Sequence, residues 1–274
     1  MGNLPLQYRL EQVRKVFGRQ QVALDGITFT VDRGERVALI GPSGAGKTTL
    51  FRLLNCTLRP TSGRLSIDGE DIESFHGKKL RRVRRLIGTV YQQHNLVPRL
   101  KVINNVLAGQ LGQWSTVRSL ISLAKPVDVE LARKALEQVS IPDKIFERTD
   151  ELSGGQQQRV AIARVLVQDP EVILADEPVS SVDPTLASSI VRLLVDISRN
   201  TRKTLVVSLH SVDLALAYFP RVIGIKNGIA AFDLAPDKIS DSMLEDLYAG
   251  HVRDSGIVEA VSEPGRPLAY PSIS

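Results

Sequence analysis

Short apolar runs, separated by turn residues and amphipathic stretches, indicate a chain that alternates strands with helices. Three runs are almost wholly apolar, which is typical of strands buried on both faces of a sheet: residues 37–40, 172–175 and 205–209. A stretch with helical periodicity, residues 185–198, separates the last two runs. Because parallel strands need such a crossover, the pattern predicts an α/β fold with a parallel sheet.

Turn signals elsewhere predict antiparallel strands. Residues 8–40 alternate short β-like runs with turn residues, and Asp68-Gly69 is a turn typical of a hairpin. Asn227-Gly228 separates the apolar runs 222–225 and 229–232, which predicts a second hairpin. Beyond residue 250 the chain has three prolines and no periodicity, so we expect a loosely ordered tail at 251–274.

A long helical stretch interrupts the strands. Helical periodicity extends from about residue 100 to 168, as at Leu131, Ala135, Leu136 and Val139, and prolines punctuate it. We therefore expect one domain over residues 1–250, with a helical subdomain inserted at about 95–168.

Composition narrows the class of protein. A chain of 274 residues with 43% hydrophobic and 24% charged residues is ordinary for a globular protein, which excludes collagen-like, disordered and disulfide-scaffold classes. The net charge of +5 is compatible with a phosphate-bearing ligand, a nucleic acid or an anionic membrane surface. A single cysteine, Cys56, cannot form an intramolecular disulfide, so we expect a reducing compartment and a small core residue.

Targeting signals are not evident in the sequence. The first twelve residues lack the basic and apolar regions of a signal peptide, and no apolar run approaches the roughly 18 residues that a membrane-spanning helix needs. We expect a cytoplasmic chain, which other subunits would have to hold at any membrane where it works.

The strongest motif is a glycine-rich loop between a predicted strand and a predicted helix at 50–54. Residues 41–48 read GPSGAGKT and match GxxxxGK[ST], the phosphate-binding loop. Its glycines let backbone N–H groups converge on phosphate oxygens at the positive end of a helix. In this pattern Lys47 would hold the β- and γ-phosphates, and the Thr48 hydroxyl would bind Mg²⁺.

Two adjacent carboxylates follow the apolar run 172–175. Asp176 and Glu177 stand at the carboxyl end of a buried strand, where open α/β sheets bind ligands. Because successive strand side chains point in opposite directions, Asp176 can face Mg²⁺ while Glu177 faces an attacking water. The pair favours a Mg-nucleotide hydrolase over two acids that merely end a strand at solvent.

The sequence LSGGQ, which begins at Leu152, precedes a predicted helix at 157–168. Taken alone, this turn of small residues indicates a helix start or a second phosphate-binding edge. LSGGQ placed 24 positions before Asp176 resembles the signature of ATP-binding-cassette (ABC) ATPases, and the resemblance covers residues 8–248. It implies a P-loop NTPase ABC cassette with an antiparallel β subdomain and a helical signature subdomain.

Further motifs stand in the order of that family. Phe17 looks like the aromatic residue that stacks on adenine, and Gln92 looks like the Q-loop glutamine, with Gln93 as its competitor. Residues 180–183, SSVD, resemble the D-loop, and His210 resembles the switch histidine that senses the γ-phosphate. Val182 stands where the family has leucine, and the phosphate loop ends in Thr-Thr where Ser-Thr is commoner.

The resemblance implies roles for individual residues. It assigns catalysis to Glu177, as general base, and to His210, Gln92 and Lys47. It assigns the binding of Mg²⁺ to Thr48, Gln92 and Asp176. Nucleotide binding falls to Phe17, Gly41, Pro42, Ser43, Gly44, Ala45, Gly46, Lys47, Thr48, Thr49, Gln92, Ser153, Gly154, Gly155, Gln156, Asp176 and Asp183.

The family also implies partners. Two copies would form a head-to-tail dimer with ATP at the interface, and Ser153 and Gly155 of one copy would complete the ATP site of the other. The dimer would lie at the cytoplasmic face of the cell membrane, as a peripheral protein, with two transmembrane permease subunits and a substrate-binding protein.

Within the transporters, three segments most resemble ATPase subunits of phosphonate importers: residues 88–100, 105–112 and 208–215. Importers of phosphite, a phosphate ester or an amino acid remain alternatives. A soluble ABC ATPase that acts on DNA or ribosomes, or a lone phosphate-loop kinase, is a rival of another class.

Other polar and aromatic residues have plainer interpretations. A basic cluster with apolar residues interleaved predicts a solvated helix face more than a nucleic-acid patch: Lys78, Lys79, Arg81, Arg82, Arg84 and Arg85. Trp114 is expected to pack in the helical subdomain. His76, His94 and His251 lack metal-ligand spacing and are expected at the surface.

Overall fold

The computed structural model describes residues 7–18, 20–92, 95–114, 128–180 and 182–249. In this part of the chain, ten strands form two sheets. The strands are β1 Tyr8–Phe17, β2 Gln21–Val31, β3 Arg36–Ile40, β4 Ser62–Ile67, β5 Glu70–Asp71, β6 Ile87–Val90, β7 Val172–Asp176, β8 Thr204–Ser208, β9 Arg221–Lys226 and β10 Ile229–Leu234.

Helices lie between the strands and after the last of them. They are α1 Lys47–Leu54, α2 Gly77–Arg85, α3 Val102–Leu107, α5 Val129–Gln138, α6 Gly154–Gln168, α7 Pro184–Thr201, α8 Val212–Tyr218 and α9 Asp241–Tyr248. Short 3₁₀ turns are η1 Ile72–Ser74, η2 Ala108–Gln110, η3 Pro142–Lys144, η4 Thr149–Glu151 and η5 Pro236–Lys238. Among the helices of the described ranges, none has the length and apolar character needed to cross a membrane.

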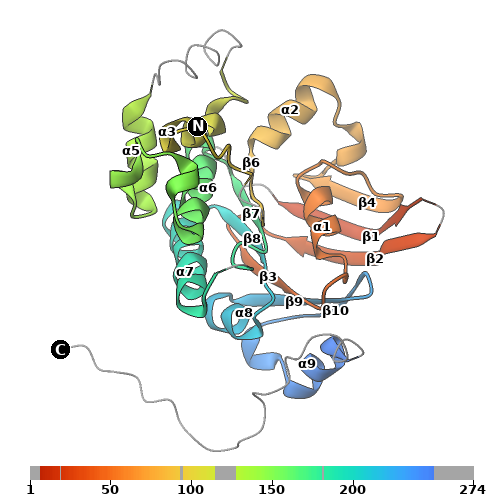
Figure 1. The fold of residues 1–274 in the computed structure, drawn as a ribbon. Helices are drawn as coiled ribbons and strands as arrows, with labels where there is room; N and C mark the ends of the chain where they lie inside the picture. Colours follow the sequence, from red (N-terminus) through yellow and green to blue (C-terminus); the bar gives the residue numbers. More distant parts are fainter. Residues whose placement is uncertain (1–6, 19, 93–94, 115–127, 181, 250–274) are drawn as a thin grey trace, which may run out of the picture.

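The larger sheet has the order β10-β9-β3-β8-β7-β6 and carries the candidate site at one end. All neighbouring pairs in it are parallel except β9 and β10. The smaller sheet, β2-β1-β4-β5, is antiparallel. Figure 1 shows the smaller sheet on one side of the central strands and helices α5, α6 and α7 on the other. The predicted α/β fold class is therefore confirmed.

The central strands are buried on both faces because alternate side chains enter two different cores. In β7, Ile173 and Ala175 pack with the helices, whereas Val172 and Leu174 pack against the smaller sheet and α1. The same division holds in β3 and β8. This two-sided burial explains why these strands read as unbroken apolar runs.

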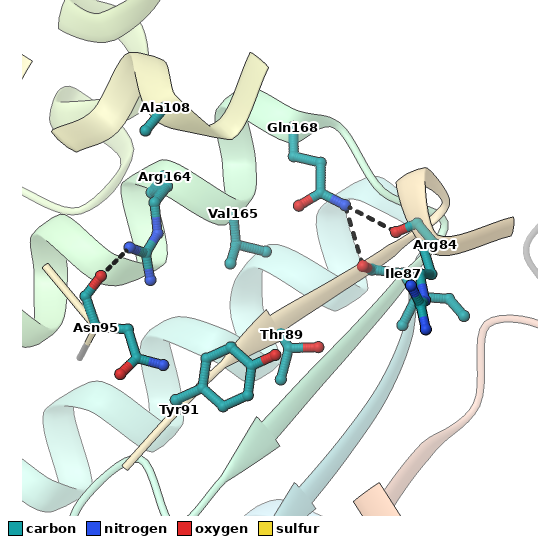
Figure 2. A pocket seen from close by; sticks show the side chains of 9 residues that line it. All are labelled: Arg84, Ile87, Thr89, Tyr91, Asn95, Ala108, Arg164, Val165 and Gln168. Atoms are coloured by element: carbon teal, nitrogen blue, oxygen red, sulfur yellow. Dashed lines mark hydrogen bonds between the residues drawn. The ribbon is translucent and has the colours of Figure 1, made fainter. Parts of the chain in front are cut away.

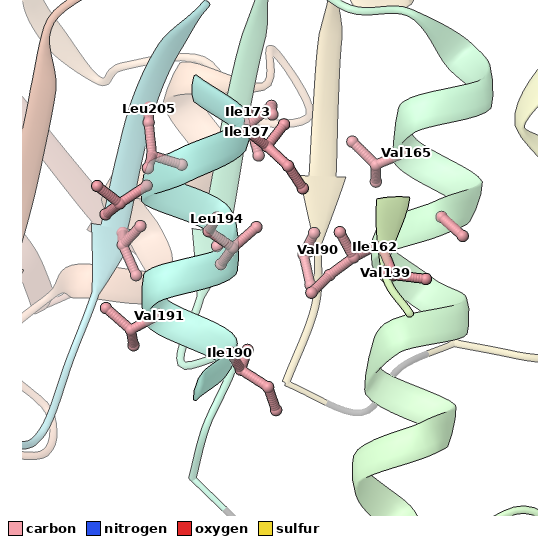
Figure 3. Packing of buried hydrophobic residues seen from close by; sticks show 14 of the residues in the cluster. Val90, Val139, Ile162, Val165, Ile173, Ile190, Val191, Leu194, Ile197 and Leu205 are labelled. Carbon is pink, nitrogen blue, oxygen red and sulfur yellow. The ribbon is translucent and has the colours of Figure 1, made fainter. Parts of the chain in front are cut away.

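Helices α6 and α7 close the first of these cores. Leu194 and Ile190 of α7 face the strands, while Ile162 and Val165 of α6 approach Val90 at the end of β6 (Figure 3). All five side chains are at most 3% exposed. Packing of this density fixes the starts of α6 and α7, where two of the predicted motifs lie.

Both predicted hairpins are present. Asn227 and Gly228 adopt positive φ angles of 50° and 78° between β9 and β10, as a two-residue hairpin turn requires. Asp68 and Gly69 also adopt positive φ angles, in the turn between β4 and β5.

Helix starts differ from the predicted ones. The helix after the phosphate loop begins at Lys47 rather than residue 50, and the signature helix begins at Gly154 rather than residue 157. Helix α7 extends beyond the predicted 185–198 at both ends. In each case the first turn contains small, proline or polar residues, which periodicity alone does not assign to a helix.

Several single-residue predictions can be checked. Cys56 is 7% exposed, and burial raises its pKa to about 11, as expected of an unreactive core thiol. Trp114 packs partly buried against the helical core, and His76 is exposed. The six cations of α2 are exposed while Leu80 and Val83 pack inward, so this helix is a solvated basic face.

Some predictions are not tested. His94, His251, Gln93, Ser181 and the tail 251–274 lie outside the described residues. Helices α3, α5 and α6 fill the described part of the predicted subdomain, whose bounds, like those of the domain, stay predictions.

Candidate functional site

The phosphate loop joins β3 to α1, and the turn of the β9–β10 hairpin is hydrogen-bonded to it. The Gly228 N–H donates to the carbonyl of Ala45 at 3.0 Å, and the Gly228 carbonyl accepts from the Asp25 N–H at 2.8 Å. The first turn of α1 has no acidic residue. Its free N–H groups and its dipole therefore favour an anion at this end of the helix.

Two glycines are required by the close approach of other backbone segments. Gly41 has φ 151°, and a Cβ there would lie 2.1 Å from the Ile225 carbonyl oxygen. Gly46, with φ 104°, caps α1 in the left-handed region, and its Cβ would lie 2.4 Å from the Ala23 carbonyl oxygen. A larger residue at either position would displace β9 or β2 from the loop.

Lys47 is folded back over the loop. Its Nζ donates to the carbonyls of Gly41 at 2.7 Å and Pro42 at 3.2 Å, and the residue is only 4% exposed. Burial lowers the pKa of Lys47, while the nearby Glu177 and Asp176 carboxylates oppose that shift. The ammonium thus lies at the centre of the loop, where it can meet a phosphate.

Asp176 ends β7 beside the last residue of β8. In the parallel register Asp176 is paired with Ser208, whose Oγ donates to Asp176 Oδ1 at 2.8 Å. Burial raises the pKa of Asp176, and hydrogen bonds from Ser208 and from the Thr48 hydroxyl oppose the shift. Thr48 and Asp176 together offer hydroxyl and carboxylate oxygens, which are the ligands that Mg²⁺ prefers.

Glu177 leaves the strand through an unusual backbone conformation. Its φ is 48°, in the left-handed region that a glutamate rarely adopts. The Glu177 N–H donates to Ser208 Oγ at 2.8 Å, so one serine hydroxyl serves both carboxylate residues. The two carboxylates therefore do not point to opposite faces of one strand, as strand alternation predicts, because β7 ends at Asp176 and the turn directs Glu177.

His210 follows β8 and contacts Glu177. Its Nε2 lies 2.8 Å from Glu177 Oε1, and the same oxygen lies 3.8 Å from Lys47 Nζ. The His210 hydrogen bond is the main cause that lowers the pKa of Glu177, and burial acts against it. Glu177 is therefore an anion at neutral pH, 14% exposed and directed toward the loop.

The structure thus brings five predicted residues together at the carboxyl ends of β3, β7 and β8: Lys47, Thr48, Asp176, Glu177 and His210. Phe17 is the last residue of β1 and is half-buried, with Lys15 Nζ 5.3 Å from its ring centre. Gln92 is exposed just beyond β6. No bond from Phe17 or Gln92 to these five residues is found in the described ranges.

The signature residues form a well-capped helix start. Ser153 Oγ accepts from the Gln156 N–H at 3.3 Å, and Gln156 Oε1 accepts from the Ser153 N–H at 3.0 Å, which is a capping box. Ser153 and Gly154 are exposed, while Gly155 packs so closely on Leu186 that a Cβ would lie 2.2 Å from that side chain.

Asp183, the last predicted D-loop residue, caps the neighbouring helix α7 by accepting from the Leu186 N–H at 2.9 Å. Within the described residues, no hydrogen bond or ion pair joins Ser153 or Gly154 to Lys47, Glu177 or His210. The exposed signature turn and the phosphate loop are thus two separate edges of one chain.

Comparison with known protein families agrees with this arrangement. Residues 24–180, more than half of the chain, match the family model described as ABC transporter. The chain belongs to the ABC transporter family. This confirms the resemblance found in the motifs, and the chain is called the cassette below.

Curated relatives cover almost the whole cassette. It is 48% identical over 227 residues to the phosphonates import ATP-binding protein PhnC of Pseudomonas fluorescens, which covers 83% of this chain and 86% of that protein. It is 47% identical over 255 residues to phosphonates import ATP-binding protein PhnC 2 of Pseudomonas aeruginosa, covering 93% and 96%.

Solved structures show the same fold. A dimeric ATP-binding cassette, MJ0796, in a post-hydrolysis state bound to ADP and Pi, is 30% identical with a TM-score of 0.69. The match covers 84% of this chain and 98% of that one. The P-loop ABC cassette predicted from the sequence is therefore confirmed.

Sequence reasoning missed two supporting residues. Ser208 lies within the run 205–209, and its bonds to Asp176 and Glu177 depend on the pairing of β7 with β8. Gly228 was assigned only to a hairpin turn, and its bond to Ala45 depends on how the hairpin packs under the loop. A polar residue at the end of an apolar run was the one signal available for Ser208.

The bonds of Ser208 lead to a prediction. Ser208→Ala should leave the buried Glu177 N–H without its acceptor, and the Asp176 carboxylate should lose the Ser208 donor and keep only the Thr48 hydroxyl. The free energy of unfolding should fall by about 1–3 kcal/mol, measured by urea denaturation. ATP turnover should fall at least about tenfold, since both carboxylates would be misplaced.

The matched control is Ser198→Ala. Ser198, near the end of α7, is fully buried like Ser208, and its Oγ donates to the Lys203 carbonyl at 2.7 Å. Ser198→Ala should lower the free energy of unfolding but leave ATP turnover per folded molecule unchanged. Equal turnover in the two variants would contradict the role given to Ser208.

Proposed function

We propose that the cassette is the ATP-hydrolysing subunit of an importer that takes up phosphonates or closely related phosphorus oxyanions. The observation that carries the proposal is the convergence of Lys47, Asp176, Glu177 and His210 at one edge of the sheet. The cargo is inferred from relatives that are named as phosphonate import ATP-binding proteins. The reaction is ATP + H₂O → ADP + phosphate.

The phosphate loop binds the triphosphate of the nucleotide. N–H groups of the loop and of the α1 start, residues 41–49, surround the phosphates, and Lys47 exchanges its carbonyl partners for β- and γ-phosphate oxygens. Phe17 supplies a half-exposed ring on which adenine stacks. The loop therefore gives affinity for any nucleoside triphosphate, and the ring favours a planar base.

Mg²⁺ fits the oxygens of Thr48 and Asp176, which already share a hydrogen bond. Gln92, which is exposed just beyond β6, is proposed as a further ligand. When bound, the ion neutralises phosphate charge and fixes the geometry of the γ-phosphate.

Glu177 acts as the general base. Its carboxylate is ionised at neutral pH because His210 and Lys47 lie beside it. A water in line with the γ-phosphate donates its proton to Glu177 as the P–O bond forms. His210 holds the carboxylate by Oε1 and, being partly exposed, also reaches toward the γ-phosphate. Lys47 stabilises the charge that develops on the phosphate oxygens.

The second phosphate edge is used across a dimer. Within the described residues no hydrogen bond or ion pair joins the signature turn to the phosphate loop of its own chain. Ser153, Gly154, Gly155 and Gln156 are therefore proposed to complete the ATP site of a second copy. Asp183, the N-cap of α7, is proposed to lie near the same dimer interface. The solved relative that is described as dimeric, with ADP and Pi, supports this arrangement.

Transport requires partners that cross the membrane. We propose that the dimer binds two permease subunits at the cytoplasmic face of the cell membrane and that a substrate-binding protein delivers the cargo. The printed names of the relatives, import ATP-binding proteins, support an ATPase that works with separate membrane subunits.

A first prediction tests the base. Glu177→Gln should keep ATP binding but lower steady-state turnover by about 10²–10⁴-fold, because a base is lost while size is kept. Turnover is measured by phosphate release, and binding by a fluorescent nucleotide. Glu245→Gln, an exposed glutamate on α9, is the control. Near-normal turnover of Glu177→Gln would remove Glu177 from this role.

A second prediction tests the dimer. Ser153→Arg should damage the site of the opposite copy, whereas Lys47→Ala damages the site of its own chain. In a mixed dimer of the two variants, one site carries both defects and the other carries none. Some hydrolysis should therefore return on mixing. If mixed dimers form, as shown with two affinity tags, but remain inactive, the signature does not act across the interface.

A third prediction tests the cargo. A strain that lacks the gene should lose growth on methylphosphonate, 2-aminoethylphosphonate or phosphite as sole phosphorus source, and keep growth on orthophosphate. A plasmid copy should restore growth, and the Lys47→Ala copy should not. Normal growth of the deletion on all three, with lost uptake of an amino acid, would overturn the cargo while leaving the ATPase intact.

A further inference from the structure

One side of helix α2 consists of positive side chains. Its cations include a set at the spacing i, i+3, i+4 and i+7, which places them on one side of a helix. This set, called the cation face below, is Lys78, Arg81, Arg82 and Arg85. All four residues are exposed, whereas Leu80 and Val83 pack inward. The helix therefore separates an apolar side from a side of like charge.

The charge of the cation face is not neutralised by the part of the chain that the structure describes. There, no ion pair or side-chain hydrogen bond involves any of its four members. The other two cations of α2 do have partners: Lys79 forms an ion pair with Glu70, and Arg84 Nη2 donates to the Cys56 carbonyl at 2.8 Å. Because like charges at i, i+4 repel each other, the cation face lowers stability unless a negative partner lies against it.

Bonds at the C-terminal end of α2 fix the direction of this face. Gln168 Nε2, at the end of α6, donates to the carbonyls of Arg84 at 3.4 Å and Ile87 at 3.0 Å (Figure 2). The Arg85 carbonyl accepts from the same amide at 3.0 Å. These bonds satisfy carbonyls that the end of a helix leaves open. The four cations are therefore presented on a helix that is held to the rest of the protein.

Helix α9 carries the opposite charge at the other end of the molecule. It has no cation and three exposed acidic residues, Asp241, Glu245 and Asp246. Figure 1 shows α2 at the upper end of the view and α9 at the lower end. The protein is thus polarised in charge, although its net charge is only +5. A negative surface attracts the α2 end and repels the α9 end.

We infer that the cation face binds the anionic headgroups of the membrane at which the cassette works. The inference rests on the proposed function, which places the cassette there. Charge complementarity supports it, because the cytoplasmic leaflet carries anionic lipids that attract clusters of Lys and Arg. Helix α2 has no aromatic residue on which a base could stack, which disfavours a single-stranded nucleic acid. The contact orients the cassette with α2 toward the membrane and α9 away from it.

Sedimentation of the isolated cassette with lipid vesicles tests the contact. The cassette should bind vesicles of phosphatidylcholine mixed with phosphatidylglycerol, and should not bind vesicles of phosphatidylcholine alone. Salt at about 1 M should release it, because the screening length falls to ~3 Å. Failure of the cassette to bind the anionic vesicles at low salt would overturn the inference.

A variant without the cation face locates the contact on α2. It combines Lys78→Gln, Arg81→Gln, Arg82→Gln and Arg85→Gln. Each cation near an anionic surface contributes about fivefold to binding, so the partition coefficient should fall about 10²-fold. ATP binding should be unchanged, which shows that the variant is folded.

A control variant removes the same charge outside α2. It combines four exposed cations: Arg192→Gln, Arg199→Gln, Arg202→Gln and Lys238→Gln. It should bind anionic vesicles within about fivefold of the wild type, because charges beyond the screening length contribute little. Equal loss of binding in the two glutamine variants would overturn the inference, since net charge alone would then explain the binding.

A third variant keeps the charge of the cation face and changes the chemical groups. It combines Arg81→Lys, Arg82→Lys and Arg85→Lys. Attraction to headgroups through charge should survive this change, whereas a bidentate contact of arginine with a protein carboxylate would be lost. Loss of vesicle binding in this variant, with its fold intact, would therefore contradict the inference.

Other partners for the cation face give different results. A nucleic acid is indicated if a mixed-sequence DNA duplex binds the wild type more tightly than the anionic vesicles do and the α2 glutamine variant loses only the duplex. A permease protein is indicated if that variant fails to assemble with the permease in vesicles of phosphatidylcholine alone. Either result would overturn the contact with lipid.

Failure of the lipid contact can be told apart from failure of the proposed function. Binding to vesicles needs no hydrolysis, so Lys47→Ala should bind anionic vesicles as the wild type does. A cassette that hydrolyses ATP but ignores anionic vesicles would overturn the lipid contact and leave the proposed function intact. A cassette that binds the vesicles but releases no phosphate from ATP would contradict the proposed function instead.

Discussion

A buried positive charge organises the functional edge of this protein. Lys47 is removed from water, so its ammonium needs partners in the protein, which it finds in two loop carbonyls and the nearby Glu177 carboxylate. These partners come from the ends of different strands. The charge can be buried only if β3, β7 and β8 end at the same level, and the parallel sheet achieves this.

The register between β7 and β8 is a second requirement for the geometry of this site. A shift of one residue would move Ser208 away from Asp176 and would also exchange the two faces of a strand buried on both sides. Apolar packing therefore fixes polar geometry here. Ile173 and Ala175 fit the helical core, Val172 and Leu174 fit the other core, and Asp176 is left beside Ser208.

Much of the fold could be predicted because its strands carry local signals. Unbroken apolar runs marked β3, β7 and β8, and Asn227-Gly228 marked a hairpin from two residues alone. The phosphate loop was equally local. By contrast, the left-handed turn at Glu177 and the bonds of Ser208 depend on segments distant in sequence, so no periodicity or motif predicts them.

The positions of these charges also order the events at the site. Lys47 Nζ donates to two loop carbonyls and lies 3.8 Å from the Glu177 carboxylate. Phosphate oxygens carry more negative charge than carbonyls, so an incoming triphosphate draws the ammonium toward itself. In the proposed reaction Glu177 would keep His210, whose Nε2 lies 2.8 Å from Oε1, and the other carboxylate oxygen would accept from the attacking water. Under the proposed function, binding of the phosphates would therefore itself be the step that makes Glu177 available as the base.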